Sequence, residues 1–156
     1  MDRLLALAAT RPLREFQDTL PLVRAKRDPA QVGAWLGAFE ANVAKTGRVD
    51  VSRLVYAAHL GLVDEAYRAA DAARLGPAGT ADDIMGPDGY RTALLFQAGM
   101  PELRRDPRFP RLCARLGLVE FWIGSGKWPD CATELPYDFQ RECAKVQDVP
   151  TEAFGF

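Results

Sequence analysis

The residues best able to bind a ligand lie in the segment "LRRDPRFPRLCARLGLVEFWIGSGKW". It holds five arginines within twelve positions, and a tryptophan follows them. Guanidinium groups bind carboxylates and phosphates through paired, charge-assisted hydrogen bonds, and arginine and tryptophan dominate the energetics of protein interfaces. The sequence therefore predicts an interaction surface made of Arg104, Arg105, Arg108, Arg111, Arg115 and Trp128.

This surface has a simpler interpretation, which the sequence favours. Arg108, Arg111 and Arg115 share a helical stripe opposite Phe109 and Leu112. A charged stripe of this kind is usually a solvated face. Its arginines would then pair with nearby carboxylates, for which Asp106, Asp130 and Asp138 are the candidates.

The motif Gly-Ser-Gly-Lys at 124–127 superficially resembles a nucleotide-binding loop. A phosphate loop needs a glycine five positions before Gly126 and a hydroxyl after Lys127. Phe121 and Trp128 occupy those positions, so both requirements fail. We expect no nucleotide and no other cofactor.

Catalytic and metal-binding residues are sparse. His59 is the only histidine, and it falls at a predicted helix C-terminus, where the helix dipole favours it without any catalytic role. Cys113, Cys131 and Cys143 form no Cys-x-x-Cys pair, so we expect reduced thiols in a bacterial-type cytoplasm and no zinc site. The sequence predicts a protein that is not an enzyme.

Length and charge narrow the class of partner. A chain of 156 residues with 48% hydrophobic residues can bury a substantial core. The net charge of −1 gives no attraction toward nucleic acid, and no apolar run is long enough to span a membrane. We expect a protein or peptide partner, with no nucleic-acid or membrane contact. The oligomeric state does not follow from the sequence.

The elements that must position these residues are helices, and the predicted fold class is all-α, with about six to eight antiparallel helices. Asp28 and Pro29 are typical of a helix start, and apolar residues recur at helical spacing up to Gly47. A second stripe, of small residues, predicts close approach of another backbone; it contains Ala30, Gly33, Gly37 and Ala41.

Two helical hairpins follow. In the first, Asp50 caps one helix, Gly61 ends it, and an alanine-rich helix runs on to Gly76. In the second, Asp106 and Pro107 start a helix that Gly117 closes in the left-handed conformation. Its second helix presents Leu118, Phe121 and Trp122 on one side, and Trp128 covers the end of the hairpin.

The predicted organisation is a single helical domain over residues 1–150. It comprises an N-terminal lobe at 1–75, a linker loop at 76–89, a C-terminal hairpin lobe at 90–150 and a flexible tail at 151–156.

The segments "ALLFQAG", "LRRDPRF", "RLGLVEFW" and "SGKWPDC" resemble the C-terminal region of bacterial tetratricopeptide-repeat proteins. The resemblance covers residues 94–132, and Gly61, Ala66 and Ala73 have the spacing of one repeat. Such regions occur in repeat-containing transcriptional regulators and adenylate cyclases. The resemblance implies a superhelix of helical hairpins, here without an effector module.

The predicted function is a non-enzymatic protein-interaction or scaffold domain, as part of a signalling or transcriptional regulator. One alternative is a small-molecule-sensing domain with an apolar pocket between helices. Another is an uncharacterised enzyme. An open groove favours peptide binding, whereas a closed apolar cavity favours a sensor.

Overall fold

The computed structural model describes residues 22, 24–76 and 92–152 of the chain. These residues are mostly helical, which confirms the predicted all-α fold. The chain separates into two compact units, Met1–Asn42 and Val43–Phe156. The predicted linker at 76–89 lies, apart from Gly76, outside the described residues. None of the helices in the described part of the chain combines the length and apolar character needed to cross a membrane.

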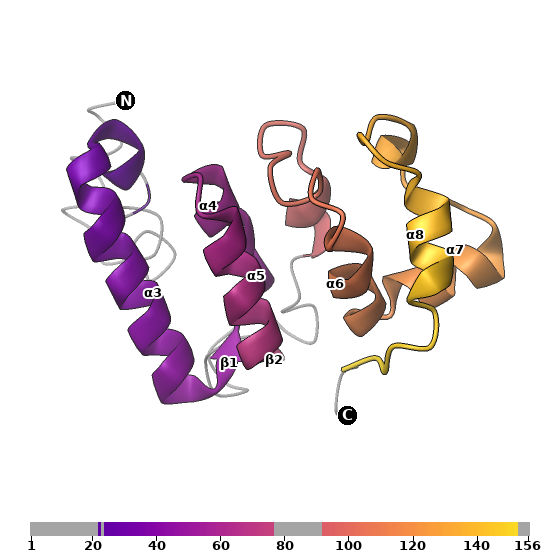
Figure 1. The fold of residues 1–156 in the computed structure, drawn as a ribbon, viewed down its shortest axis with the longest axis horizontal. Coiled ribbons are helices and arrows are strands. Elements are labelled where there is room, and N and C mark those ends of the chain that lie inside the picture. Colours follow the sequence, from indigo (N-terminus) through magenta and orange to yellow (C-terminus); the bar gives the residue numbers. More distant parts are fainter. Residues whose placement is uncertain (1–21, 23, 77–91, 153–156) are drawn as a thin grey trace. The chain divides into compact units, whose positions relative to one another are not determined.

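Short helices and turns make up most of the described chain (Figure 1). The α-helices are α3 (Val32–Thr46), α4 (Val51–His59), α5 (Val63–Ala72), α6 (Phe109–Arg115), α7 (Leu118–Ser125) and α8 (Phe139–Lys145). The 3-10 helices are η1 (Pro29–Gln31), η4 (Thr92–Phe96) and η5 (Asp130–Thr133), and the strands are β1 (Arg48–Val49) and β2 (Arg74–Leu75).

The start of the α3 segment follows the predicted capping. The Asp28 side chain accepts a hydrogen bond from the Ala30 N–H at 3.0 Å, and Pro29 begins η1. Trp35 and Phe39 are buried and stack with ring centroids 5.4 Å apart. The predicted stripe of small residues is exposed, and no described atom lies within 4 Å of a Cβ built at Gly33 or Gly37. None of the described residues makes the predicted close backbone approach to this stripe.

The α4–α5 hairpin forms as predicted at its start. The Asp50 carboxylate accepts hydrogen bonds from the Ser52 N–H and hydroxyl, both at 2.7 Å. Gly61 takes a φ of +87° in the turn. The helix α5 ends at Ala72, four residues before the predicted Gly76. The buried face of the hairpin contains Val51, Leu54, Val55, Ala58, Ala66, Ala69, Ala70 and Ala73.

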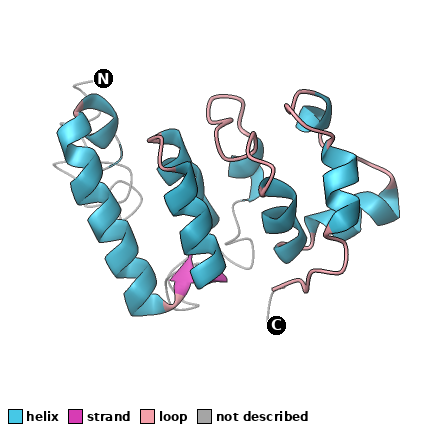
Figure 2. Cartoon of the chain, viewed as in Figure 1, coloured by secondary structure: helices cyan, strands magenta, loops and turns pink. Residues whose placement is uncertain are grey.

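The hairpin ends are joined by a small sheet that the sequence did not predict. β1 and β2 pair in parallel, with Val49 opposite Leu75, directly before α4 and after α5 (Figure 2). Strands of two residues are too short to show alternation in a sequence. The sheet closes the α4–α5 unit at the end where α5 stops.

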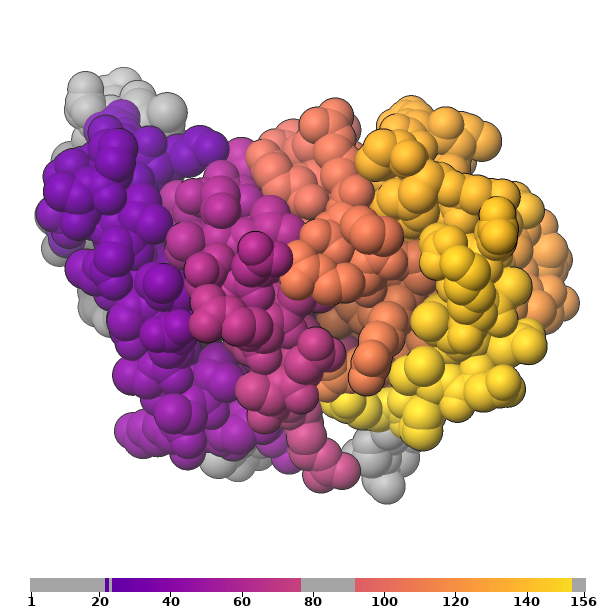
Figure 3. Space-filling view, viewed as in Figure 1, coloured from indigo at the N-terminus to yellow at the C-terminus, as the bar shows by residue number. Residues whose placement is uncertain are grey.

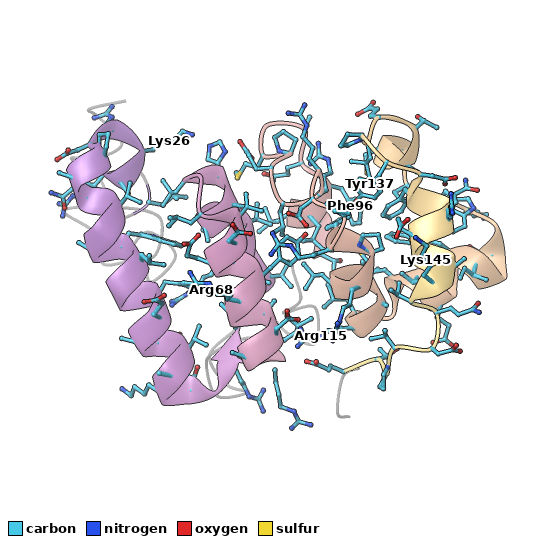
Figure 4. The ribbon with its side chains drawn as sticks, viewed as in Figure 1. Lys26, Arg68, Phe96, Arg115, Tyr137 and Lys145 are labelled. Carbon is cyan, nitrogen blue, oxygen red and sulfur yellow. The ribbon has the colours of Figure 1, made fainter. Side chains whose placement is uncertain are left out.

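An aromatic cluster forms the core between η4, α6, α7 and α8. Phe109 and Phe139 are fully buried, and their ring centroids lie 6.0 Å apart. Trp122 packs edge-on against Phe139 at 5.4 Å and against Phe96 at 6.0 Å. Figure 4 shows Phe96 and Tyr137 among the side chains that fill this region. The cluster fixes α6 between its neighbouring elements.

The α6–α7 hairpin differs from the prediction in two details. Asp106 accepts a hydrogen bond from the Arg108 N–H, but α6 begins at Phe109 because residues 107–108 form a turn. On α7, Val119 and Trp122 are buried, whereas Phe121 is 59% exposed. The predicted inward face of Leu118, Phe121 and Trp122 is therefore rotated toward Val119.

Gly117 joins α6 to α7 with a φ of +73°, as predicted. A Cβ at this position would lie 3.2 Å from Cγ2 of Thr151. We expect Gly117→Val to lower the free energy of unfolding by about 2–4 kcal/mol, because a β-branched residue strains the left-handed backbone and displaces Thr151. Urea denaturation measures the loss.

Gly124→Val is the matched control. Gly124 is exposed on α7 and has no described atom within 4 Å of a built Cβ. We expect a change of less than about 0.5 kcal/mol there, since valine has the better helix propensity. Equal effects of the two substitutions would contradict the assignment of Gly117 as a strained turn.

Candidate functional site

Arg104 does not belong to an exposed surface, contrary to the prediction. It is 6% exposed, and its guanidinium Nη1 donates to the carbonyl oxygen of Gln97 at 2.6 Å. The carbonyls of Leu95 and Met100 lie at 3.5 and 3.4 Å from the same nitrogen. A cation at the carbonyl end of a helix satisfies acceptors that have no partner within the helix. Arg104 therefore caps the end of η4.

Arg115 is also buried, at 9% exposure, and so leaves the predicted surface. Its guanidinium donates to the carbonyls of Ala70 at 2.6 Å and Ala73 at 2.8 Å, at the C-terminus of α5. Its Nε donates to Glu152 at 2.6 Å. Figure 4 shows Arg115 near the lower ends of α5 and α6. The side chain connects three segments that are distant in sequence.

Glu152, in the predicted tail at 151–156, makes hydrogen bonds with α6 and β2. The Glu152 N–H donates to the Arg115 carbonyl at 2.8 Å, and the Glu152 carboxylate accepts from the Leu75 N–H at 2.8 Å. Residues 153–156 lie outside the described part of the chain.

Arg108 is partly exposed and holds two carboxylates. It donates to both oxygens of Asp106 at 2.7–2.8 Å and to Asp64 at 2.6 Å. Its guanidinium carbon lies 4.4 Å from the centre of the Tyr67 ring. The hydrogen bond from Arg108 lowers the pKa of Asp106. Because Asp64 begins α5, this cluster ties the start of α5 to the start of α6.

Arg105 and Arg111 are the members of the predicted surface that remain exposed, and the described residues offer neither side chain a hydrogen-bond or ion-pair partner. Trp128 is half-buried, with its ring 6.2 Å from Trp122 and 6.3 Å from Phe139. It packs over the aromatic cluster next to α7, where Trp128 was predicted to cover the end of the hairpin. In Figure 3 the segment of α6 shows as a band between the magenta α4–α5 segment and the yellow α8 segment.

The structure brings together one pair that sequence reasoning missed. Nδ1 of His59 lies 3.2 Å from Oε1 of Glu102, and both side chains are partly buried. Oε2 of Glu102 is buried without a hydrogen-bond partner among the described residues. The pair joins the end of α4 to the turn after residue 100. The separation of 43 residues left no local signal in the sequence.

The thiols are unsuited to nucleophilic attack. Cys113, Cys131 and Cys143 are buried and unbridged. Burial raises the pKa of all three, that of Cys143 to about 12. Since the thiolate is the reactive form, these cysteines act as core residues. Among the described residues, no group of three potential ligands is placed to hold a metal ion.

Burial likewise raises the pKa of Tyr67 and Tyr137. Their hydroxyls donate at 2.8 Å to the carbonyls of Leu103 and Arg104, respectively. These two hydrogen bonds hold the turn 101–105 against α5 on one side and against the residues before α8 on the other.

No protein-family model, curated protein or solved structure matches this chain. The function is therefore argued from the geometry of the site.

The capping role of Arg104 predicts a large effect on stability. We expect Arg104→Met to lower the free energy of unfolding by about 2–4 kcal/mol, because buried carbonyls lose a charged donor. Arg105→Met, one residue away and exposed, should change it by less than about 0.5 kcal/mol. Urea denaturation of both variants decides the matter, and similar losses would refute the capping assignment.

The pair of Glu152 and Arg115 predicts a dependence on pH. Burial raises the pKa of Glu152, whereas hydrogen bonds from Arg115 and Leu75 lower it. The lowering effects together are larger, so the net shift of the pKa is downward from 4.5. A lowered pKa in the folded state contributes stability above the unfolded-state pKa, and this contribution is lost as pH falls through the folded-state value.

We therefore expect Glu152→Gln to lower the free energy of unfolding by about 2 kcal/mol at pH 7 and by progressively less below about pH 4.5. Glu142→Gln is the control, because its exposed pair with Lys145 at 2.6 Å contributes little at any pH. Denaturant titrations from pH 7 to pH 3 measure the difference. A loss that stays constant over this range would contradict the assignment.

Proposed function

We propose that this chain is a non-enzymatic protein-interaction or scaffold domain. The observation that carries the proposal is that some of the neighbouring arginines are bonded within the protein and others are exposed. Arg104, Arg108 and Arg115 are held by carbonyls and carboxylates. Arg105, in the turn before α6, and Arg111, on α6, are exposed and have no hydrogen-bond or ion-pair partner among the described residues. An exposed guanidinium on an ordered backbone can bind a carboxylate at a low cost in conformational entropy.

The arrangement of the helices supports an interaction domain of the repeat type. α4 packs against α5 and against η4, and α6 packs against α7 and α8. Arg108 contacts the start of α5 and Arg115 contacts its end, so α5 and α6 run in the same direction. Stacked helical hairpins of this kind present extended surfaces to partners.

A role in a bacterial signalling or transcriptional regulator in the cytoplasm is consistent with the resemblance to tetratricopeptide-repeat proteins. The non-enzymatic assignment is supported by the protonated, buried state of the thiols. The partner should carry acidic groups, because the two exposed side chains of the proposed surface are cationic and have no ion-pair partner among the described residues.

The test replaces both exposed arginines. We expect Arg105→Ser with Arg111→Ser to leave the melting temperature nearly unchanged, since exposed charges add little stability. Partner capture from the native cell extract, quantified by mass spectrometry, should fall about tenfold for a specific subset of proteins. That subset should also be released from the parent chain by added salt.

The matched control is Arg48→Ser with Arg74→Ser. These two arginines are also exposed, but they lie on the small sheet at the opposite end of α5. The control should retain the subset that the first variant loses. If both double variants capture the same proteins as the parent at equal salt, Arg105 and Arg111 are not the interaction surface.

A further inference from the structure

The Glu152 carboxylate occupies a site with three donors. Oε1 accepts from Nε of Arg115 and lies 2.6 Å from its Nη2, and Oε2 accepts from the Leu75 N–H at 2.8 Å. These donors come from α6 and β2, and the carboxylate comes from beyond α8. The donors that bind the carboxylate therefore belong to elements distant in sequence from Glu152, as they would for a separate ligand.

Groups other than the carboxylate also orient the arginine. The Ala70 and Ala73 carbonyls orient the Arg115 guanidinium with two hydrogen bonds of their own. These carbonyls are neutral, so a buried cation remains that requires an anion. Asp71 supplies a weak one, since its carboxylate is 62% exposed and lies 3.9 Å away.

Main-chain groups around the site contact the peptide backbone as well as the carboxylate. The Arg74 N–H donates to the Gly47 carbonyl and the Gly76 N–H donates to the Val49 carbonyl, both at 3.0 Å, so the Leu75 N–H points to the outer edge of the sheet. The Arg115 carbonyl accepts from the Glu152 N–H at 2.8 Å. The Thr151 methyl lies against Gly117, where a Cβ would crowd it. The site therefore contacts the Glu152 carboxylate, the Glu152 main-chain N–H and the Thr151 side chain.

We propose that Arg115, the Leu75 N–H and the Arg115 carbonyl form a binding site for a peptide segment that carries a glutamate. Residues 151–152 fill this site in cis. An acidic segment of a partner with a small residue before its glutamate competes for it. The Asp71 carboxylate near Arg115 disfavours a dianionic phosphate, so a singly charged carboxylate is the preferred group.

This site uses different side chains from Arg105 and Arg111. Its ligand is a peptide carboxylate held by a buried arginine, whereas the proposed surface uses exposed arginines. Binding in the site can therefore be tested with purified protein and defined ligands, whatever the natural partner is.

The first experiment empties the carboxylate position of the full chain. We expect Glu152→Ala to lower the melting temperature on the order of 5–10 °C, because Arg115 loses its anion. Sodium propionate should then raise it by about 2 °C or more, relative to sodium chloride at equal ionic strength. Glu152→Gln should not respond to propionate, because its amide fills the position, and neither should the parent or Glu142→Ala.

The second experiment separates a peptide site from a simple carboxylate site. The probe is the acetylated, amidated peptide VPTEA, the sequence of residues 149–153, and the control is VPTQA. We expect VPTEA to stabilise Glu152→Ala at concentrations at least about tenfold lower than propionate, since it adds main-chain contacts. VPTQA should be inert at those concentrations.

Each result bears on the proposal. If propionate and VPTEA act equally, the site binds carboxylates only and the peptide assignment is wrong. If neither stabilises Glu152→Ala beyond the chloride control, the site does not exist. Should Glu152→Ala be unfolded, recovery of helical circular dichroism is the readout, with Glu152→Asp tested in parallel, and no recovery in either variant overturns the proposal.

Discussion

The buried guanidinium of Arg115 is the constraint on which the larger unit depends. A cation at this depth is tolerated only when hydrogen bonds and a counter-charge replace its water. Arg115 finds the carbonyls at the end of α5 and the carboxylate of Glu152. Because these partners come from both sides of α6 in the sequence, one side chain holds the α4–α5 hairpin, α6 and the end of the described chain in one arrangement.

Arg104 is likewise buried and donates to a carbonyl at the end of η4. Both arginines cap helix ends with positive charge, where carbonyl oxygens have no partner within the helix. Between them, Arg108 joins the start of α5 to the start of α6 through Asp64. The arginine-rich segment is thus an internal clamp in a unit of short helices. Short helices gain little stability from their own hydrogen bonds, so ties between elements matter more here than in a bundle of long ones.

Features encoded within a few residues could be predicted from the sequence. Asp28 and Asp50 cap the elements expected, and Gly117 takes the left-handed conformation expected, because each depends on its immediate neighbours. The roles of the arginines could not be predicted. Periodicity places Arg115 on one stripe of α6, but it does not reveal that other elements cover that stripe as well.

Contacts such as His59 with Glu102, or Arg115 with Glu152, join residues 43 and 37 positions apart, and composition carries no signal of them. Phe121 was predicted to face inward because of its helical spacing, but its side chain is 59% exposed. Of the arginines predicted to be exposed, Arg104 and Arg115 are buried.

The clamp and the exposed arginines are physically linked. Arg111 lies one helical turn before Arg115, so the ion pair of Arg115 with Glu152 fixes the backbone that carries Arg111. Arg105 lies next to Arg104, whose hydrogen bonds to the η4 carbonyls fix the turn that carries it. An exposed side chain binds more tightly when its backbone is already ordered, because less entropy is lost on binding. The buried arginines thus supply the rigidity from which their exposed neighbours would act.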